Sequence, residues 1–355
     1  MTANFQQAGA YTALITPFHL DGRLDLERFR ALVAFQLKEG IDGLVPCGTT
    51  GETPTLEWRE HDKLIEIAVE LSAGSRPVVA GCGSNSTEEA IDATRRAKEL
   101  GVDAALLVDC YYNGPSSLEL REEYYQRILD AVSELPIVPY VIPGRTGCAL
   151  EAADLAILHL RAPERVPAVK EATGDLERMR EDRAVAGETL QIVSGDDDMT
   201  LRMMRDEGIR ASGVISVMSN LFPGAISRML ELERAGDSSG ADALSESLKP
   251  VFGLVGCAIE SERVLPNGKR VKSVDRFRNP LPVKTMMAGL RMCELGLRPP
   301  LGKMLAPAVE RCREALIEVN RRDSSLLAPI AEHFEGGTVE ERLADDARWA
   351  SLARA

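Results

Sequence analysis

The chain has 355 residues and a mass of 38.6 kDa, which is enough for one large domain or two moderate ones. Its 45% hydrophobic and 27% charged residues are typical of a soluble globular protein and exclude a largely disordered chain. The formal net charge of −13 disfavours broad binding to nucleic-acid phosphates or to an anionic membrane. A small anionic substrate remains compatible with it, because a site can be locally positive.

The sequence shows no membrane-span pattern and no export signal, so a cytoplasmic protein is expected. No apolar run reaches the roughly 18 residues that a transmembrane helix needs. The first seven residues lack a basic start followed by an apolar stretch. The seven cysteines are scattered, odd in number and never spaced as Cys-x-x-Cys, which predicts buried free thiols. Four histidines without a pair at ligand spacing make a metal site unexpected.

Short, β-branched apolar runs alternate with amphipathic stretches over the first 236 residues. The runs predict strands at 12–16, 43–47, 78–81, 104–108, 137–141, 166–170, 191–194 and 212–217. Helical patterns lie between them, and Ser86-Thr87-Glu88-Glu89 is typical of a capping box at a helix start. Eight strand–helix units predict an α/β protein with a (β/α)8 TIM barrel over residues 8–236. An open doubly wound sheet is less favoured, because no Gly-x-Gly-x-x-Gly follows the first run.

After residue 237 the pattern predicts helices only, at about 238–258, 282–295 and 304–320. These would form a C-terminal helical domain over 237–322. The polar, basic stretch at 260–279 lies between the first two of these helices and contains a turn signal, Pro266-Asn267-Gly268-Lys269. The remaining residues, 323–355, are interpreted as an extra tail that packs loosely from Glu335 onward.

Lys170 is the most informative candidate for chemistry. The active site of a (β/α)8 barrel lies at the C-terminal ends of the strands, and Lys170 ends the otherwise apolar sixth run. Burial favours a neutral amine, which is a nucleophile that forms imines with carbonyls. The alternative is a strand-end lysine whose amine simply reaches solvent.

Other polar residues follow neighbouring strands. Thr49 and Thr50 stand between two glycines after the second run and could meet an anionic or carbonyl oxygen, or form a plain turn. Tyr140 ends the fifth run as a candidate proton donor and acceptor, and Arg145 follows it as a candidate carboxylate clamp. An amphipathic strand-end tyrosine and a solvated loop arginine are their structural alternatives. Together with Lys170, these residues form a constellation that predicts imine chemistry.

Several ordered segments carry a resemblance to a known family. They are Gly48-Thr49-Thr50-Gly51-Glu52, Tyr111-Tyr112-Asn113-x-Pro115-Ser116, Tyr140-x-x-Pro143-x-Arg145-Thr146-Gly147, Val169-Lys170-Glu171-Ala172-Thr173-Gly174, Ser194-Gly195-Asp196-Asp197, Gly213-Val214-Ile215-Ser216-Val217 and Asn279-Pro280-Leu281-Pro282-Val283-Lys284. Over about residues 8–320 the sequence resembles the dihydrodipicolinate synthase / N-acetylneuraminate lyase family of class I pyruvate aldolases. The double threonine, the Tyr-Tyr-Asn loop and the arginine of Pro-x-Arg-Thr-Gly resemble its dihydrodipicolinate synthase branch, since sialic-acid lyases usually carry serine-threonine and lack this arginine.

The resemblance implies both a reaction and roles for single residues. Pyruvate would condense with L-aspartate 4-semialdehyde to 4-hydroxy-tetrahydrodipicolinate, a step towards diaminopimelate and lysine, with no cofactor beyond the imine to the substrate. Lys170 would form the Schiff base, Tyr140 would shuttle protons, and Thr49 and Tyr112 would extend the relay. Thr50 and the Ile215 backbone would hold pyruvate. Arg145 would bind the carboxylate of the aldehyde.

The same resemblance implies self-association and an effector site. Tyr112 would reach into the site of a neighbouring subunit, which implies a homodimer or homotetramer. The positions that match the family's inhibitory lysine site are Trp58, His61, Asn85, Glu89 and Tyr111. The structural alternatives are that Glu89 only completes a capping box and that Trp58 only packs at an interface.

The chain departs from the family in three places. Val141 and Ile142 follow Tyr140 where Asn-Val is usual, which removes a local hydrogen-bonding side chain. The 260–279 insertion and the tail are additional, and both bear on the oligomer more than on the chemistry. Two other functions stay open: a sister aldolase or hydratase-aldolase acting on another aldehyde or 2-oxo acid, and a catalytically silent regulatory paralogue.

Overall fold

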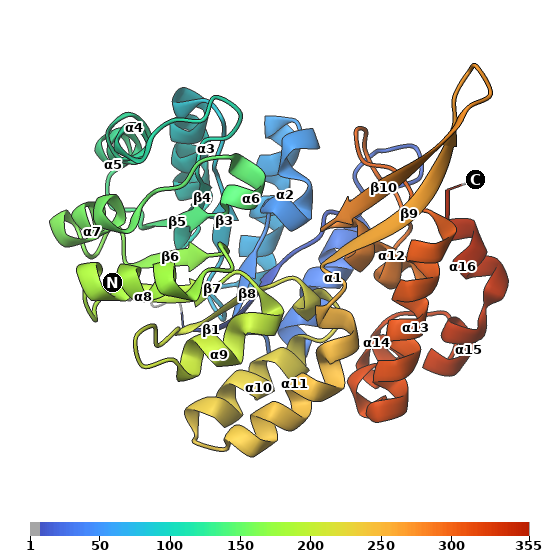
Figure 1. Cartoon of the computed structure of the whole chain (residues 1–355). Helices are drawn as coiled ribbons and strands as arrows, with labels where there is room; N and C mark the ends of the chain where they lie inside the picture. Colours follow the sequence, from blue (N-terminus) through green and yellow to red (C-terminus); the bar gives the residue numbers. More distant parts are fainter. Residues whose placement is uncertain (1–7, 355) are drawn as a thin grey trace.

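The computed structural model describes residues 8–354, and its centre is a closed barrel of eight parallel strands (Figure 1). The strands are β1 (Gly9–Ala13), β2 (Gly43–Val45), β3 (Val79–Gly81), β4 (Ala104–Val108), β5 (Ile137–Val141), β6 (Ala168–Glu171), β7 (Gln191–Ser194) and β8 (Gly213–Ser216). They follow one another in the order β2-β1-β8-β7-β6-β5-β4-β3, and a bridge between Leu44 and Val78 closes the ring. The predicted TIM barrel is confirmed.

Helices surround the barrel between successive strands. They are α1 (Leu26–Lys38), α2 (Trp58–Ser72), α3 (Thr87–Glu99), α4 (Ser117–Glu119), α5 (Arg127–Ala131), α6 (Pro143–Thr146), α7 (Ala152–Arg161), α8 (Leu176–Ala186), α9 (Thr200–Arg205) and α10 (Pro223–Arg234). A π-helical segment, Leu120–Gln126, joins α4 to α5. Short 3-10 turns occupy Thr49–Gly51, Thr53–Thr55, Asp197–Met199, Met218–Asn220 and Ser324–Leu326.

The first strand lies three residues earlier than predicted. Gly9 pairs with Gly213 of β8, where a Cβ on Gly213 would lie 2.1 Å from the Gly9 carbonyl oxygen. The two backbones come this close only because both residues are glycines. A prediction that looks for β-branched residues does not recognise glycines as the start of a strand. Thr16, the expected end, instead donates its hydroxyl hydrogen to the Gly51 carbonyl at 2.6 Å.

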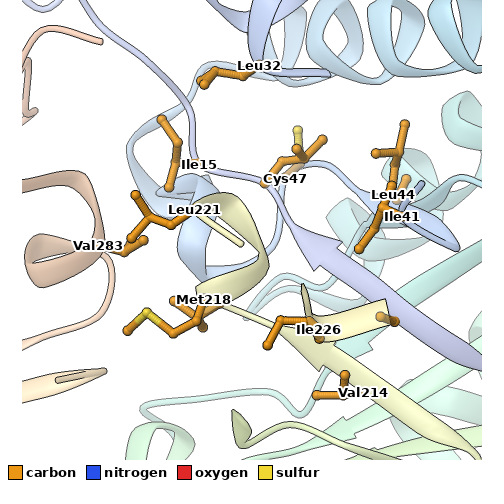
Figure 2. Packing of buried hydrophobic residues seen from close by; sticks show 14 of the residues in the cluster. Ile15, Leu32, Ile41, Leu44, Cys47, Val214, Met218, Leu221, Ile226 and Val283 are labelled. Carbon is orange, nitrogen blue, oxygen red and sulfur yellow. The ribbon is translucent and has the colours of Figure 1, made fainter. Parts of the chain in front are cut away.

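Two apolar layers stabilise the barrel. The inner layer fills its interior with side chains such as Tyr11, Val138 and Ile215. The outer layer lies between strands and helices, and it extends without a break to the C-terminal helices. Figure 2 shows Val283 of that region beside Leu221, which places α12 against the barrel.

The C-terminal region corrects the prediction of helices only. Its elements are α11 (Ser238–Phe252), β9 (Gly256–Val264), β10 (Arg270–Arg278), α12 (Leu281–Gly289), α13 (Ala306–Arg322), α14 (Ala328–His333), α15 (Val339–Ala344) and α16 (Asp346–Leu352). The polar stretch is an antiparallel hairpin that projects from the body of the protein (Figure 1). At its base, Cys257 and Ile259 are buried while their neighbours are exposed, which is the alternation of a strand. The many charged residues of the segment hide this alternation in the sequence.

The tail packs closely rather than loosely, which is a second correction. Trp349 is 2% exposed and lies on Gly289, where a Cβ would come within 2.1 Å of the indole ring. Arg342 is fully buried, and its guanidinium donates to the Leu290 carbonyl at 2.7 Å. The few apolar residues of the tail thus fall on faces that meet α12 and α13, whereas its average polarity suggested a loose segment. Within residues 8–354, no helix is both long and apolar enough to cross a membrane.

Candidate active site

Lys170 lies at the C-terminal end of β6 with its side chain inside the barrel. It is 5% exposed, and its Nζ lies 4.1 Å from the centre of the Tyr140 ring, the residue beside it in the register of β5 and β6. Burial lowers the pKa of the amine to about 8, although the charges of Asp196 and Asp197 oppose this shift. A much larger fraction of the amine than for an exposed lysine is therefore neutral and nucleophilic at physiological pH.

Tyr140 ends β5 and is also buried. Burial raises the pKa of its phenol to about 12, while the charge of Arg145 and a hydrogen bond with the Thr49 hydroxyl act in the opposite direction. The phenol therefore keeps its proton at neutral pH. Beside the amine of Lys170 it can accept one proton and release another.

The threonine loop after β2 is fixed from the C-terminal region. Asn279 donates from Nδ2 to Oγ1 of Thr50 at 3.0 Å. Glu52 ends the loop in a left-handed conformation and forms a fully buried ion pair with Lys284 of α12. The Lys284 amine also donates to the carbonyls of Thr16 at 3.0 Å and Gly296 at 2.8 Å.

Sequence reasoning gave no role to Lys284 or Asn279. Both residues belong to the family-like segment at 279–284. The signal that could have found them is a lysine within an otherwise apolar helix, because such a lysine needs a buried partner.

Arg145 lies on α6 at the edge of the barrel mouth. The residue as a whole reaches solvent, but its guanidinium is partly enclosed where Nη2 donates to the Asn279 carbonyl at 3.0 Å. A cavity of about 380 Å³ opens beside it and has Thr49 and Tyr140 in its wall. A cation therefore stands at the entrance of a cavity that contains the hydroxyl relay.

Strands β7 and β8 complete the floor. A Cβ on Gly195 would lie 3.2 Å from Cε of Lys170 and 2.6 Å from Cβ of Ala172, so only glycine leaves this space free. Asp197 accepts hydrogen bonds from the Val217 and Met218 amides at 3.0 Å each, which fastens the end of β7 to β8. Ile215 is fully buried in the barrel interior, two positions before this junction.

Four of the five candidate effector residues line the same cavity as Thr49, Tyr140 and Arg145. They are Trp58, His61, Glu89 and Tyr111. Asn85 is not part of its wall, and neither are Lys170, Thr50 and Ile215. Tyr112 is 91% exposed and lies outside it.

The effector residues have partners of their own. His61 is buried with Nε2 at 2.7 Å from the Gly81 carbonyl oxygen. The guanidinium of Arg96 lies 5.2 Å from the centre of the Trp58 ring and so covers one aromatic face. Glu89 accepts from the Ser84 hydroxyl at 2.5 Å, and only the Ser86 half of the expected capping box forms. The prediction of a complete box is therefore wrong at Glu89.

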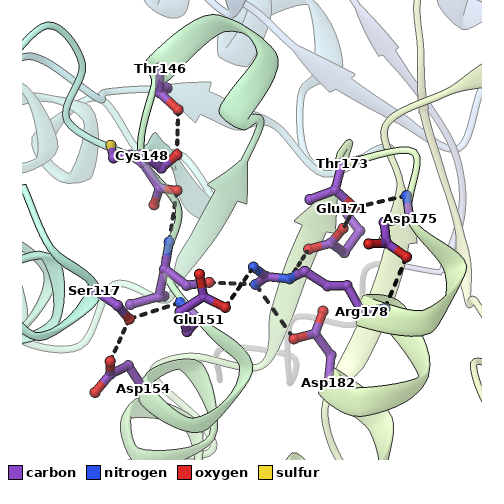
Figure 3. A network of polar contacts seen from close by, with 12 residues as sticks. Ser117, Thr146, Cys148, Glu151, Asp154, Glu171, Thr173, Asp175, Arg178 and Asp182 are labelled. Carbon is purple, nitrogen blue, oxygen red and sulfur yellow. Dashed lines mark hydrogen bonds and ion pairs between the residues drawn. The ribbon is translucent and has the colours of Figure 1, made fainter. Parts of the chain in front are cut away.

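A buried polar network lies on the outer side of β6, behind Lys170 (Figure 3). The guanidinium of Arg178 lies 3.4 Å from Glu171 and 3.6 Å from Asp182, both of which are fully buried. Burial and the charge of Asp182 raise the pKa of Glu171 to about 8, although Arg178 opposes this. The network anchors the strand end that carries Lys170. Within residues 8–354, no three His, Cys, Asp or Glu side chains are grouped to hold a metal ion.

Comparison with known proteins places this geometry in a family. The model of the dihydrodipicolinate synthetase family matches residues 6–265. The chain belongs to the dihydrodipicolinate synthetase family. A 4-hydroxy-tetrahydrodipicolinate synthase of Nitratidesulfovibrio vulgaris (strain DP4) is 41% identical over 311 residues, which cover 88% of this chain and 98% of the relative. The synthase of Endomicrobium trichonymphae is 39% identical over 309 residues, 87% of this chain and 97% of the relative.

Solved structures agree with the family assignment. The dihydrodipicolinate synthase of Aquifex aeolicus is 36% identical with a TM-score of 0.77, covering 88% of this chain and 98% of that one. The dihydrodipicolinate synthase of Acinetobacter baumannii, solved in complex with pyruvate, is 31% identical with a TM-score of 0.78, covering 89% and 99%. That of Cyanidioschyzon merolae, solved with lysine bound, is 32% identical with a TM-score of 0.77, covering 88% and 98%.

Proposed function

We propose that this chain is a 4-hydroxy-tetrahydrodipicolinate synthase, which condenses pyruvate with L-aspartate 4-semialdehyde. The observation that carries the proposal is the buried amine of Lys170, with its lowered pKa, against the protonated phenol of Tyr140. Family membership and the names of relatives about 40% identical over most of the chain support the same activity.

The reaction would begin with the neutral amine of Lys170 attacking the keto carbon of pyruvate. Tyr140, relayed by Thr49, would donate the proton that lets the hydroxyl leave as water and give the imine. Loss of a proton from the pyruvate methyl group gives an enamine, which adds to the aldehyde carbon of the second substrate. The amino group of that substrate would then attack the imine carbon, close the ring and release Lys170.

Two carboxylates have to be held during these steps. Thr50 and the backbone of Ile215 would receive the pyruvate carboxylate. Arg145 would bind the carboxylate of the aldehyde, because a guanidinium offers two parallel donors to it. The support for this division is position: Ile215 belongs to the apolar interior of the barrel with Tyr140, whose strand neighbour is Lys170, and Arg145 lines the cavity that contains Thr49 and Tyr140.

We further propose a homodimer or homotetramer in the cytoplasm. Tyr112 is 91% exposed in a left-handed conformation, with φ of 76°, in the single chain. A large exposed aromatic ring held this way suits insertion into the site of a partner subunit, where it would extend the relay.

Lysine is the proposed effector, bound by Trp58, His61, Asn85, Glu89 and Tyr111. The buried Oδ1 of Asn85 has no hydrogen-bond partner in residues 8–354, and it could accept from the ammonium group of a ligand. Calorimetric titration with lysine, with and without pyruvate, should give heat at millimolar lysine or below. No heat together with undiminished turnover would reject the site.

The proposed function is tested with pyruvate, a panel of aldehydes and reductive trapping of the imine. Turnover should be fastest with aspartate semialdehyde, and borohydride with pyruvate should add mass to the peptide that contains Lys170. Faster turnover with another aldehyde would favour a sister aldolase. No trapped pyruvate would favour a silent paralogue.

A further inference from the structure

The β9–β10 hairpin brings a second arginine to the entrance of the site. Its tip turns at Gly268, where φ is 83°, and its base packs inward through Cys257 and Ile259. A hydrogen bond of 3.1 Å from Arg311 of α13 to the Ala258 carbonyl fixes that base. The matched region of the family model ends at residue 265, before β10 begins. β10 therefore lies outside the matched region.

One face of β10 is basic in a protein whose net charge is −13. The exposed positions of the strand alternate and carry Arg270, Lys272, Val274, Arg276 and Arg278. Arg270 at the tip is paired with Glu262 at 2.6 Å. Within the described part of the chain, no carboxylate lies at ion-pair distance from the other three cations of this face. Lys272 lies opposite Glu262 in the strand register, whereas Arg276 and Arg278 lie opposite Ala258 and Gly256. The charges of Arg276 and Arg278 are thus available to a mobile anion.

Arg278 is held beside Arg145. Its Nη1 donates to the Gly144 carbonyl at 2.9 Å, and the next residue, Asn279, accepts from Arg145 through its own carbonyl at 3.0 Å. Each arginine thus donates to the residue next to the other arginine: Arg278 to Gly144, and Arg145 to Asn279. These two contacts hold the guanidiniums close together. The repulsion between them contributes to the lowered pKa of Arg145, after the larger effect of burial.

Two like charges fixed together without a carboxylate favour binding of an anion between or above them. Arg278 uses one of its five N–H groups on Gly144, so the others remain for a ligand. Both proposed substrates carry a carboxylate, and Arg145, beside Arg278, lines the cavity whose wall includes Tyr140, the neighbour of Lys170. The product carries two.

We propose that Arg278 is a substrate-capturing residue, which with Arg145 forms a two-arginine entrance that attracts the carboxylates of incoming substrates. This rests on the proposed function for the identity of those substrates. Arg278 acts on capture and not on the chemistry at Lys170. Its removal should therefore lower kcat/KM and leave kcat nearly unchanged.

The test compares Arg278→Gln with Arg278→Lys and with the matched control Arg270→Gln, on the same face at the hairpin tip. At low ionic strength, Arg278→Gln should lower kcat/KM for aspartate semialdehyde by about 3- to 10-fold, and 0.5 M NaCl should reduce the difference to less than about 2-fold. Arg278→Lys should keep most of the low-salt rate, because the point charge remains. Arg270→Gln should behave as the unmodified protein.

A second measurement separates this proposal from the proposed function. The rate of pyruvate trapping on Lys170 with cyanoborohydride needs no aldehyde, and it should show the same salt-dependent loss in Arg278→Gln. If the unmodified protein traps pyruvate but does not consume aspartate semialdehyde, the proposed function fails and trapping alone decides on Arg278. Equal behaviour of Arg278→Gln and Arg270→Gln would overturn the proposal. So would a fall in kcat that Arg278→Lys does not restore, since that would indicate a structural role.

Discussion

Replacing Lys170 by methionine is expected to abolish imine formation and to stabilise the folded protein at neutral pH. The amine is 5% exposed, and burial lowers its pKa from 10.5 to about 8. Below pH 8 the folded protein therefore has to hold a charge in a poorly solvated place. Methionine has a similar length and no charge, so it fills the barrel without that cost.

The size of the effect follows from the two pKa values. The unfolded chain binds the Lys170 proton more tightly than the folded chain, by about 2.5 pH units, which corresponds to about 3 kcal/mol. The penalty is complete below pH 8 and disappears as the pH rises towards 10.5. The folded-state pKa already contains the opposing attraction of Asp196 and Asp197, so Lys170→Met should gain up to about 3 kcal/mol at pH 7 and almost nothing near pH 10.5.

Urea unfolding of both proteins at equal concentration, at pH 7 and near pH 10, measures this difference directly. The free energy of unfolding of the variant should exceed that of the unmodified protein at pH 7, and the two values should converge at the higher pH. A gain that does not depend on pH, or a loss at pH 7, would refute the idea that Lys170 is destabilised by desolvation.

Four further outcomes are expected. The rate of imine formation by Lys170 should rise about tenfold per pH unit and level off near pH 8. The rate is measured by stopping borohydride trapping at set times and weighing the protein by mass spectrometry, and a midpoint near pH 10.5 would contradict the prediction. Lys284→Met should lower the free energy of unfolding, measured in urea, by about 3–5 kcal/mol, and adding Glu52→Gln to this variant should recover part of that loss. If the losses of the two single variants simply add in the double variant, the two residues do not act as a coupled pair. Trp349→Ala should cost about 3–5 kcal/mol, which an unchanged thermal midpoint would contradict. Arg145→Ala should raise KM for aspartate semialdehyde and leave pyruvate trapping intact, whereas unchanged aldehyde kinetics would remove its proposed role.

The barrel was predictable because each of its strands is short, apolar and bounded by polar turns. Periodicity predicted β4, β5 and β7 to the residue, since their apolar runs coincide with the paired residues. It displaced β1, where two glycines and not branched side chains define the pairing with β8. Local composition predicts a strand well when the buried residues are also the apolar, β-branched ones. It predicts a strand less well when a close approach of two backbones determines where the strand begins.

The site was predictable in part. Lys170 could be found as a polar end to an apolar run, and Tyr140 beside it follows from the parallel order of the strands. Alternation alone, however, could not show that Thr49, Tyr140 and Arg145 share one cavity with Trp58 and the residues around it. That arrangement depends on the lengths and directions of loops, which a periodic pattern does not record.

The hairpin and the tail were misinterpreted for a common physical reason. Both are rich in charge, and charge on an isolated segment is typical of loops. In the hairpin, however, pairs such as Arg263–Asp275 satisfy charges across the strands, and in the tail Arg342 donates to backbone carbonyls that helix ends leave free. The groups that pair with these charged side chains lie in another element or several residues away in the sequence. A search for apolar periodicity therefore cannot detect them.

The C-terminal region is part of the active site and not an appendage to the barrel. Lys284 ties the Glu52 end of the threonine loop to α12, and Asn279 touches both Thr50 and Arg145. Loss of the Lys284 amine alone would leave the carboxylate of Glu52 buried and uncompensated, which is more costly than losing a surface pair. The threonine loop should then open, so the stability of the C-terminal helices and the affinity for both carboxylate substrates depend on the same contacts.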